Sequence, residues 1–446
     1  MHSRWLYLLV ACALARPVAA QNQPTQLVTQ PVDAASVVTL HGTVHPLVRS
    51  GIDRGPVNES IPAERLLLVL NRPPEREAAF QQLLKDLHTP GSPNYHQWLT
   101  PDEIGNRFGP AAGDLDAVTG WLRSSGFSVS RVSRAGRFIE FSGNVGQVNA
   151  AFHTQIHEYM VNGALHHANA TEVQIPQALA GIVKGVSPLN DFRPQSLSRA
   201  GGKGRYDAAA RQFVPQFTLP SSWSPLLYGV APADFYTEYD LAPLYTASVT
   251  GAGKTIGIID ESNIDVNLGN AYRSVFGLAA NPVQVVLDGG DPGMNSSDVE
   301  SYLDVEVAGA VAPGATVNLY ISAGSPYQDP LALAALRAVE DNQADVLSIS
   351  WGAGEQELGA SGNQFWSALW EQAAAQGQTV LVSAGDMGQL PDENYAFIGL
   401  FTAPAVNGLA STPWNVAVGA ALTLHERRQE QLHLTEADRI DQHFHE

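Results

Sequence analysis

Between residues 255 and 383, short apolar runs alternate with amphipathic helical patterns, and this alternation restricts the fold more than any other feature of the chain. Apolar runs typical of buried strands lie at 255–260, 316–321, 345–350 and 379–383. Helical patterns lie between them, at 297–311, 329–341 and 364–376. Strands that alternate with helices in this way pair in parallel and carry helices on both faces of the sheet. The pattern predicts an α/β fold with a doubly wound, mainly parallel sheet in residues 236–446.

Residues 36–195 show a different pattern and are predicted to form a smaller α+β unit of the ferredoxin-like kind. Its predicted strands lie at 66–70, 127–132, 137–142 and 154–160, and its predicted helices at 74–89, 114–125 and 146–152. Residues 196–235 are rich in Gly, Pro and basic residues, which is typical of an accessible linker. We expect a processing site in this linker.

The first twenty residues are typical of a secretory signal peptide. Arg4 precedes an apolar run at 6–14, and small residues at 18–20 form a cleavage site before Gln21. The alternative is a membrane anchor, but the run is shorter than the roughly 20 apolar residues that a spanning helix needs. Cys12 is the single cysteine and lies in this segment, so the mature chain has no cysteine chemistry. We expect an extracellular or periplasmic protein without membrane contact once residues 1–20 are removed.

The charge balance of the chain restricts the classes of partner that we expect it to bind. Of its 446 residues, 25 are Lys or Arg and 44 are Asp or Glu. Nucleic acid is therefore not expected as a partner, because phosphate binding needs a basic surface. Carboxylates become neutral in acid and then repel one another less, so the acidic composition suits an exported protein that works at low pH.

Three carboxylates are the candidate site residues. Glu300 and Asp304 lie four residues apart, hence on one face of the helix predicted at 297–311. A capping box formed by Ser297 and Glu300 is the structural alternative. Because the helix is partly apolar, however, a buried carboxylate pair that shares a proton or serves a reaction is also indicated. Asp386 follows the apolar run at 379–383, at the strand end where open α/β sheets place their sites; a simple turn is its alternative.

Two further patterns are set aside. Residues 248–255 end like a phosphate-binding loop, but Ser248 replaces the required first Gly and a strand follows where a helix should. The histidines near residue 446 lack the spacing of metal ligands. We expect no nucleotide cofactor and no metal at these positions.

Taken together, the motifs resemble the sedolisin family of serine-carboxyl peptidases, which have a subtilisin-like fold and a pro-kumamolisin-type activation domain. In the N-terminal part the resemblance rests on Ser-Pro-Asn-Tyr-His-Gln-Trp-Leu-Thr-Pro at 92–101 and its continuation to Pro110. In the C-terminal part it rests on Glu-Ser-Tyr-Leu-Asp at 300–304, Ser-Ile-Ser-Trp-Gly at 348–352 and Ser-Ala-Gly-Asp at 383–386. The motifs follow the family's order along nearly the whole mature chain.

The resemblance implies a role for each carboxylate. Glu300 would be the general base that activates a serine, Asp304 the carboxylate that orients it, and Asp386 the acid that donates a hydrogen bond to the oxyanion. A carboxylate can still accept a proton in acid, where a histidine base would already be protonated. Asp386 must be neutral to donate, which acid and a dry site both favour. Protein or peptide substrates, and the chain's own activation domain as an intramolecular inhibitor, are the implied partners of an expected monomer.

The chain also departs from the family pattern. No Gly-Thr-Ser-x-x-x-Pro nucleophile motif and no Asp-rich calcium motif follow Gly419, although calcium is expected in full-length members of the family. Ala420 and Ala421 stand where the family usually has Gly-Thr, and Met387 replaces the usual Ser. Without a nucleophilic serine no acyl-enzyme can form, so we expect this chain to be inactive. The alternative function is a secreted peptide-binding pseudoprotease.

Overall fold

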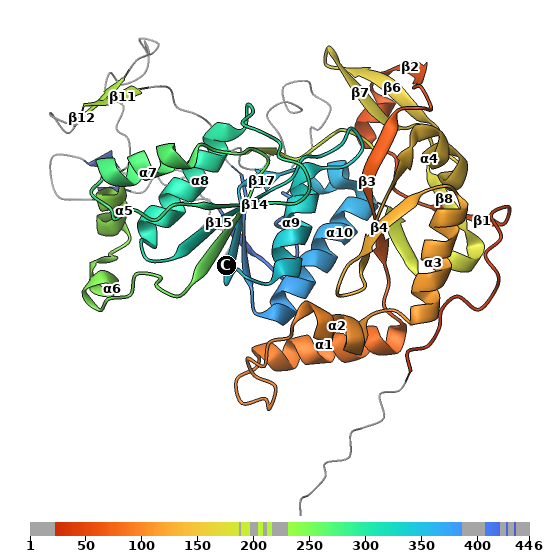
Figure 1. Cartoon of the computed structure of the whole chain (residues 1–446), viewed down its shortest axis with the longest axis horizontal. Coiled ribbons are helices and arrows are strands. Elements are labelled where there is room, and N and C mark those ends of the chain that lie inside the picture. The colour runs from red at the N-terminus through yellow and green to blue at the C-terminus, as the bar shows by residue number, and fades with distance from the viewer. Residues whose placement is uncertain are drawn as a thin grey trace, which may run out of the picture.

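The computed structural model describes residues 23–186, 189–196, 231–385 and 406–419, together with the backbone of four short strands at 204–207, 212–215, 425–426 and 432–433. These residues form two layered units that pack side by side (Figure 1). The predicted signal peptide, much of the predicted linker and Asp386 lie outside the described residues. No helix in the described ranges has the length and apolar character required to cross a membrane.

The N-terminal unit is built on a four-stranded antiparallel sheet. Its strand order is β4 (Ser128–Val132), β5 (Phe138–Asn144), β3 (Pro62–Leu70) and β9 (Val183–Val186). With the helices that connect these strands, this is the ferredoxin-like arrangement, as predicted. The helices are α1 (Pro74–His88), α2 (Pro101–Phe108), α3 (Ala112–Ser124) and α4 (Val145–Phe152).

Two smaller sheets complete this unit. One consists of β2 (Ile52–Pro56), β6 (Ile156–Val161) and β7 (Ala164–Asn169), and the other of β1 (Val37–Leu40) and β8 (Val173–Pro176). The sequence analysis missed α2, although its start carries a clear signal. Thr100 and Glu103 form a capping box around Pro101, the favoured residue at the first helical position.

The C-terminal unit contains a six-stranded sheet in which every described pair of neighbours is parallel. The order is β14 (Gln284–Leu287), β15 (Thr316–Ile321), β13 (Thr255–Ile259), β16 (Val346–Ile349), β18 (Thr379–Ser383) and β19 (Val416–Val418). Its helices are α5 (Pro232–Glu238), α6 (Ala242–Thr246), α7 (Val266–Val275), α8 (Asp298–Val311), α9 (Pro330–Asp341) and α10 (Glu355–Gln376). The predicted doubly wound sheet is confirmed.

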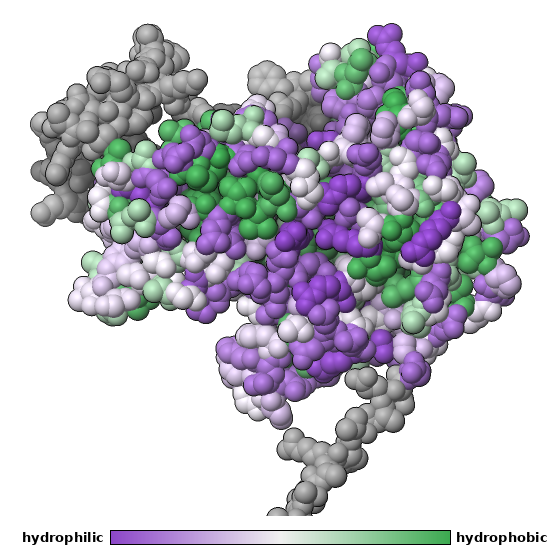
Figure 2. All heavy atoms as spheres, viewed as in Figure 1, coloured by the Kyte–Doolittle hydropathy of each residue, from purple (hydrophilic) through white to green (hydrophobic). Residues whose placement is uncertain are grey.

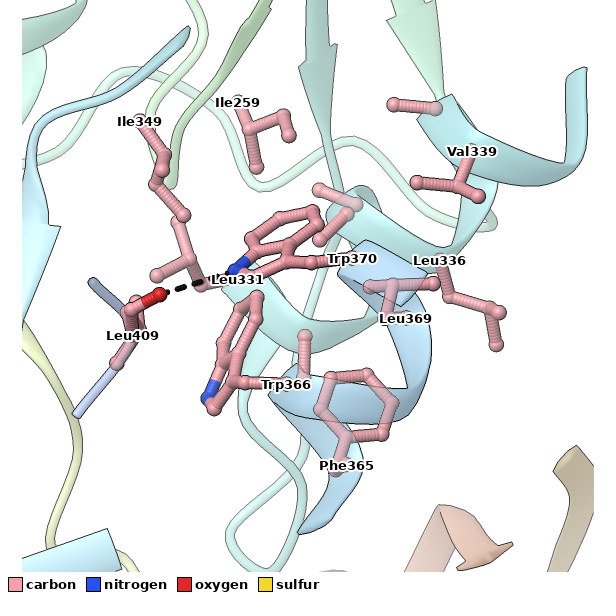
Figure 3. Close-up of a cluster of buried hydrophobic side chains, with 14 of the residues drawn as sticks. Ile259, Leu331, Leu336, Val339, Ile349, Phe365, Trp366, Leu369, Trp370 and Leu409 are labelled. Carbon is pink, nitrogen blue, oxygen red and sulfur yellow. Dashed lines mark hydrogen bonds between the residues drawn. The ribbon is translucent and has the colours of Figure 1, made fainter. Parts of the chain in front are cut away.

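Helices α9 and α10 form a layer that both units share. They cover one face of the parallel sheet, and α10 also packs against β3 and β9 of the N-terminal sheet. Trp366 and Trp370 of α10 lie at the centre of this core, and Trp370 Nε1 donates a hydrogen bond to Leu409 O at 3.0 Å (Figure 3). One continuous core therefore joins the two units.

The consecutive apolar residues of β3 reflect the position of this strand between two layers of helices. Leu66, Leu68 and Leu70 pack with α3 and α4 in the core of the N-terminal unit, whereas Leu67 and Val69 pack with α9 and α10. Side chains of a strand point to alternate faces, so five consecutive apolar residues are required when both faces are buried. Leu67 and Leu68 are each fully buried.

Substituting adjacent leucines on opposite faces of β3 separates the two cores. Leu67→Ala should weaken the packing between the units, and Leu68→Ala should weaken the N-terminal unit itself, each by about 2–5 kcal/mol. Thermal unfolding of the whole chain measures the total loss, and hydrogen exchange locates it. In Leu67→Ala the faster exchange should appear at α10, and in Leu68→Ala at α3 and α4. The same exchange pattern in both variants would contradict this assignment of the faces.

Candidate active site

Glu300 lies in the first turn of α8, at the carboxyl edge of the parallel sheet. Although it is an acidic residue, only 3% of its surface is exposed, because α8 packs against β13 and β15. The Ser297 side chain makes no capping hydrogen bond, so the capping-box interpretation is wrong. Glu300 is instead directed to a contact with a distant part of the chain.

That contact comes from the end of the N-terminal unit, residues 189–196, which we call the tail. Residues Gln195–Ser196 form strand β10, which pairs antiparallel with β17 (Trp351–Gly352). The pairing brings the Ser196 hydroxyl to Glu300, where Ser196 Oγ donates a hydrogen bond to Glu300 Oε2 at 2.5 Å. One oxygen of Glu300 is thus placed to accept a hydrogen bond from a serine hydroxyl.

Asp304 lies one helical turn after Glu300. Its Oδ1 accepts a hydrogen bond from Ser350 Oγ at 3.0 Å, while its buried Oδ2 has no hydrogen-bond partner within the described part of the chain. Burial raises the pKa of Asp304 to about 7, and the charge of Glu300 adds to the rise. The structure therefore brings Glu300 and Asp304 together as the sequence predicts, and it places Ser350 beside them.

A third carboxyl group, which the sequence analysis did not select, belongs to Asp260 directly after β13. It is fully buried and its Oδ1 accepts a hydrogen bond from the Glu261 backbone N–H at 2.7 Å. Burial raises the pKa of Asp260 to about 8, and the charges of Asp304 and Glu300 contribute to the same shift. Asp260 could have been found in the sequence from its position at the carboxyl end of a predicted strand, where open α/β sheets place their sites.

Asp386 lies outside the described residues, so its predicted role stays a prediction. The strand before it, β18, ends at Ser383 on the same edge of the sheet. Asn407, another residue that sequence reasoning missed, connects this edge: its Nδ2 donates to Trp351 O at 3.1 Å and to Ser383 O at 2.7 Å. The strand that pairs with the tail and the strand that leads to Asp386 are thereby held together.

No metal site is evident in the described ranges. Within them, no group of three or more His, Cys, Asp or Glu side chains could hold a metal ion.

Comparison with known proteins assigns the chain to a class. Residues 51–192 match the family model "Pro-kumamolisin, activation domain", and residues 290–425 match the "Subtilase family" model. The parallel sheet with a carboxylate pair at its carboxyl edge, preceded by the activation-domain match, agrees with the subtilase class of serine-type peptidases. These two matches and the similarity to sedolisin support a member of the sedolisin family within this class.

Three relatives show the extent of the similarity. Sedolisin of Pseudomonas sp. (strain 101) is 29% identical over 428 residues, which is 94% of this chain and 69% of that protein. Xanthomonalisin of Xanthomonas sp. (strain T-22) and kumamolisin of Bacillus sp. (strain MN-32) are each 28% identical, over 70% and 74% of this chain. The chain spans 38% of the length of xanthomonalisin and 57% of that of kumamolisin.

A solved structure is also similar. It is Pseudomonas sedolisin (serine-carboxyl proteinase) complexed with two molecules of pseudo-iodotyrostatin, with 27% sequence identity and a TM-score of 0.36. The match covers 46% of this chain and 56% of that chain.

The raised pKa values of the buried carboxyls predict how folding stability depends on pH. Asp260 and Asp304 keep their protons in the folded state up to about pH 7–8, whereas in the unfolded chain they ionise near pH 4. The free energy of unfolding should therefore decrease as pH rises from 4 to 8, by at most about 1.4 kcal/mol per pH unit for each group. Asp260→Asn should flatten this decrease in denaturant titrations at pH 4, 6 and 8.

The matched control is Asp116→Asn, which removes an exposed carboxylate of α3. The control should keep the slope of the unmodified chain. Equal slopes for Asp260→Asn and the unmodified chain would contradict the assignment of Asp260 as a buried, protonated group.

Proposed function

We propose that the protein is the zymogen of an exported, acid-acting serine-carboxyl endopeptidase. The observation that carries the proposal is the position of Glu300, whose Oε2 accepts a hydrogen bond from a serine hydroxyl beside the Asp304 carboxyl. The arrangement is that of a base ready to take a serine proton. The Ser196 hydroxyl of the tail stands in for the hydroxyl of a nucleophile. Export is proposed on the sequence of residues 1–20.

In this proposal Glu300 removes the proton of the nucleophilic serine, and Asp304 holds Glu300 in position. A carboxylate base remains partly ionised near pH 4, where an imidazole would be fully protonated. The raised pKa of Asp304 keeps this neighbour neutral in acid, so it places no second negative charge beside Glu300. We further propose that Asp386, neutral at the same pH, donates a hydrogen bond to the oxyanion.

The N-terminal unit acts as the inhibitor in this proposal. Its tail covers Glu300, and an ion-pair network holds the unit in place. Arg65 contacts Glu140 of its own unit at 2.9 Å and Asp288 of the C-terminal unit at 2.6 Å, and Arg131 contacts the same two carboxylates. Hydrophilic residues gather where the two units meet (Figure 2). Removal of the tail would expose Glu300 to a substrate.

We propose that the 446-residue chain alone is inactive, because the nucleophile motif of the family has no counterpart in its sequence. A chimera tests both parts of the proposal: the chain up to Gly419 is continued by the C-terminal segment of Pseudomonas sedolisin that carries this motif. After acid processing the chimera should hydrolyse denatured protein near pH 4. Glu300→Gln should lower kcat/KM by about 100-fold or more, because a general base is lost.

Glu306→Gln is the matched control, since Glu306 is another carboxyl of α8 whose pKa burial raises to about 7. It should leave activity within a few-fold of the parent chimera. Hydrolysis that survives Glu300→Gln would contradict the role of Glu300. Peptides released by the 446-residue chain alone, and abolished by Glu300→Gln, would contradict its proposed inactivity.

Acid should also weaken the docking of the N-terminal unit on the C-terminal unit. Although burial opposes the shift, Arg65 and Arg131 hold the pKa of Glu140 below its usual value. A lowered carboxyl pKa stabilises the ionised contact above that pKa, and the stabilisation is lost as pH falls through it. After tryptic cleavage in the linker, the two units should comigrate in size-exclusion chromatography at pH 7 and separate in acid. Glu140→Gln should shift the separation to higher pH, while the exposed control Glu59→Gln should not. Identical separation profiles for the two variants would contradict a role for this network.

A further inference from the structure

The tail is held at its start between two histidine rings. The Phe192 ring lies between those of His45 and His166, at centroid distances of 4.2 Å and 4.4 Å and interplanar angles of 14° and 18°. His166 belongs to β7, and His45 directly precedes a 3₁₀ helix (Pro46–Arg49). Phe192 lies four residues before Ser196. This three-ring stack therefore fixes the tail to the N-terminal unit just before the tail reaches the carboxylate pair.

His45 is buried in its neutral form. Only 4% of its surface is exposed, and its Nδ1 accepts a hydrogen bond from Leu47 N at 3.2 Å. A ring nitrogen that accepts an N–H holds no proton of its own, so this contact requires a neutral imidazole. Burial lowers the pKa of His45 to about 3, the charge of His166 adds to the shift, and that of Asp191 opposes it. Although an aromatic face attracts a cation, burial outweighs that attraction here.

Two neighbouring contacts respond to acid in the opposite sense. Asp191 of the tail contacts His166 Nδ1 at 3.0 Å and His167 Nδ1 at 3.3 Å. Both contacts become ion pairs when the histidines are protonated, so they favour the docked tail in acid. The three side chains are 20–26% exposed, and water and salt screen such pairs. We therefore expect the buried His45 to dominate the response of the stack to pH.

The C-terminal unit adds charged groups on the other side of His45. Arg193 of the tail and Asp329 and Glu357 of the C-terminal unit line the same cavity as His45. Each contacts a backbone group of the C-terminal unit, at distances of 2.5–3.0 Å: Arg193 donates to Ser325 O, Asp329 accepts from Leu331 N, and Glu357 accepts from Gly354 N. The pKa of His45 stays low beside these two carboxyl groups, because burial is the largest influence on it.

We propose that the three-ring stack is a pH-dependent latch, which holds the tail over Glu300 at neutral pH and releases it in acid. This regulatory role rests on the proposed function, since it takes the tail as the inhibitor. Release of Phe192 uncovers one face of the His45 ring, so that water reaches the imidazole and a proton can bind. A histidine whose pKa is lowered by docking stabilises the docked state above about pH 6.5, and this stabilisation is lost as pH falls.

Hydrogen exchange of the whole chain measures release of the tail. Asp191 N donates to His167 O at 3.1 Å, so the amide of Asp191 exchanges only when the tail leaves β7. For a pKa of about 6.5 when released and about 3 when docked, His45 should favour release about 30-fold more at pH 5 than at pH 7.5. The protection factors of peptides that cover residues 189–196 should fall accordingly. Amides of α3 should keep their protection, which distinguishes release of the tail from global unfolding.

Two substitutions remove the titrating group in different ways. His45→Asn keeps a side-chain acceptor before the 3₁₀ helix, because Asn is a favoured N-cap residue. His45→Phe instead keeps an aromatic ring against Phe192. Neither side chain takes up a proton, so the loss of tail protection between pH 7.5 and pH 5 should be about 30-fold smaller in both variants than in the unmodified chain. Circular dichroism checks that each variant is folded, and either one that folds is sufficient for the test.

His153→Asn is the matched control. It makes the same substitution at an exposed histidine of the same unit, where the left-handed backbone (φ 47°) also suits Asn. This variant should keep the pH dependence of the unmodified chain. Equal pH dependence in the unmodified chain and the His45 variants would overturn the proposal. A parallel loss of protection in α3 would overturn it as well, because the tail would then not be released separately.

The chimera separates the latch from the proposed function. The rate of its acid processing should depend less steeply on pH when it carries His45→Asn. Unchanged pH dependence of processing in this variant would contradict the latch alone. A parent chimera that hydrolyses no protein, although its tail shows the expected exchange, would support the latch and contradict the peptidase function.

Discussion

The packing of α9 and α10 between two sheets is the interaction on which the rest of the structure depends. The parallel sheet buries one face of this helical layer, and β3 and β9 of the N-terminal sheet bury the other side of α10. Close-packed cores transmit position accurately, because they tolerate little displacement. The N-terminal unit is consequently fixed on the C-terminal unit, and its tail leaves β9 at a defined place beside β17. The hydrogen bond between Ser196 and Glu300 is a consequence of that placement.

Two sets of carboxyl groups respond to pH in opposite directions. Asp260 and Asp304 at the candidate site are buried among like charges, so their raised pKa values favour the folded state in acid. Glu140 is buried among arginines at the junction of the units, so its lowered pKa favours docking at neutral pH. Acidification therefore favours the folded C-terminal unit while it weakens the contacts that dock the N-terminal unit. The two responses together suit a zymogen that is docked near neutral pH and released in acid.

Local pattern was sufficient for much of the fold. The strands β13, β15, β16 and β18 and the helix α8 could be predicted, because each carries its own periodicity. Strands β14 and β19 were missed, since four and three residues at the rim of a sheet carry little pattern. The residues of the candidate site also differ in how far the sequence could identify them. Glu300 and Asp304 share one helix and were found by spacing, whereas Ser196 and Asn407 act through contacts between residues far apart in sequence.

Backbone pairing alone binds the tail only weakly to β17. Only two residues, Gln195 and Ser196, pair with β17 in the described part of the chain, and each backbone hydrogen bond contributes about 1 kcal/mol net. The side chains add to this binding: Ser196 donates a hydrogen bond to the Glu300 carboxyl, and Arg193 donates one to Ser325 O. The contact to Glu300 weakens when this carboxyl gains a proton. In the proposed function, the tail would therefore be held at neutral pH and released in acid, where a peptide substrate would replace it.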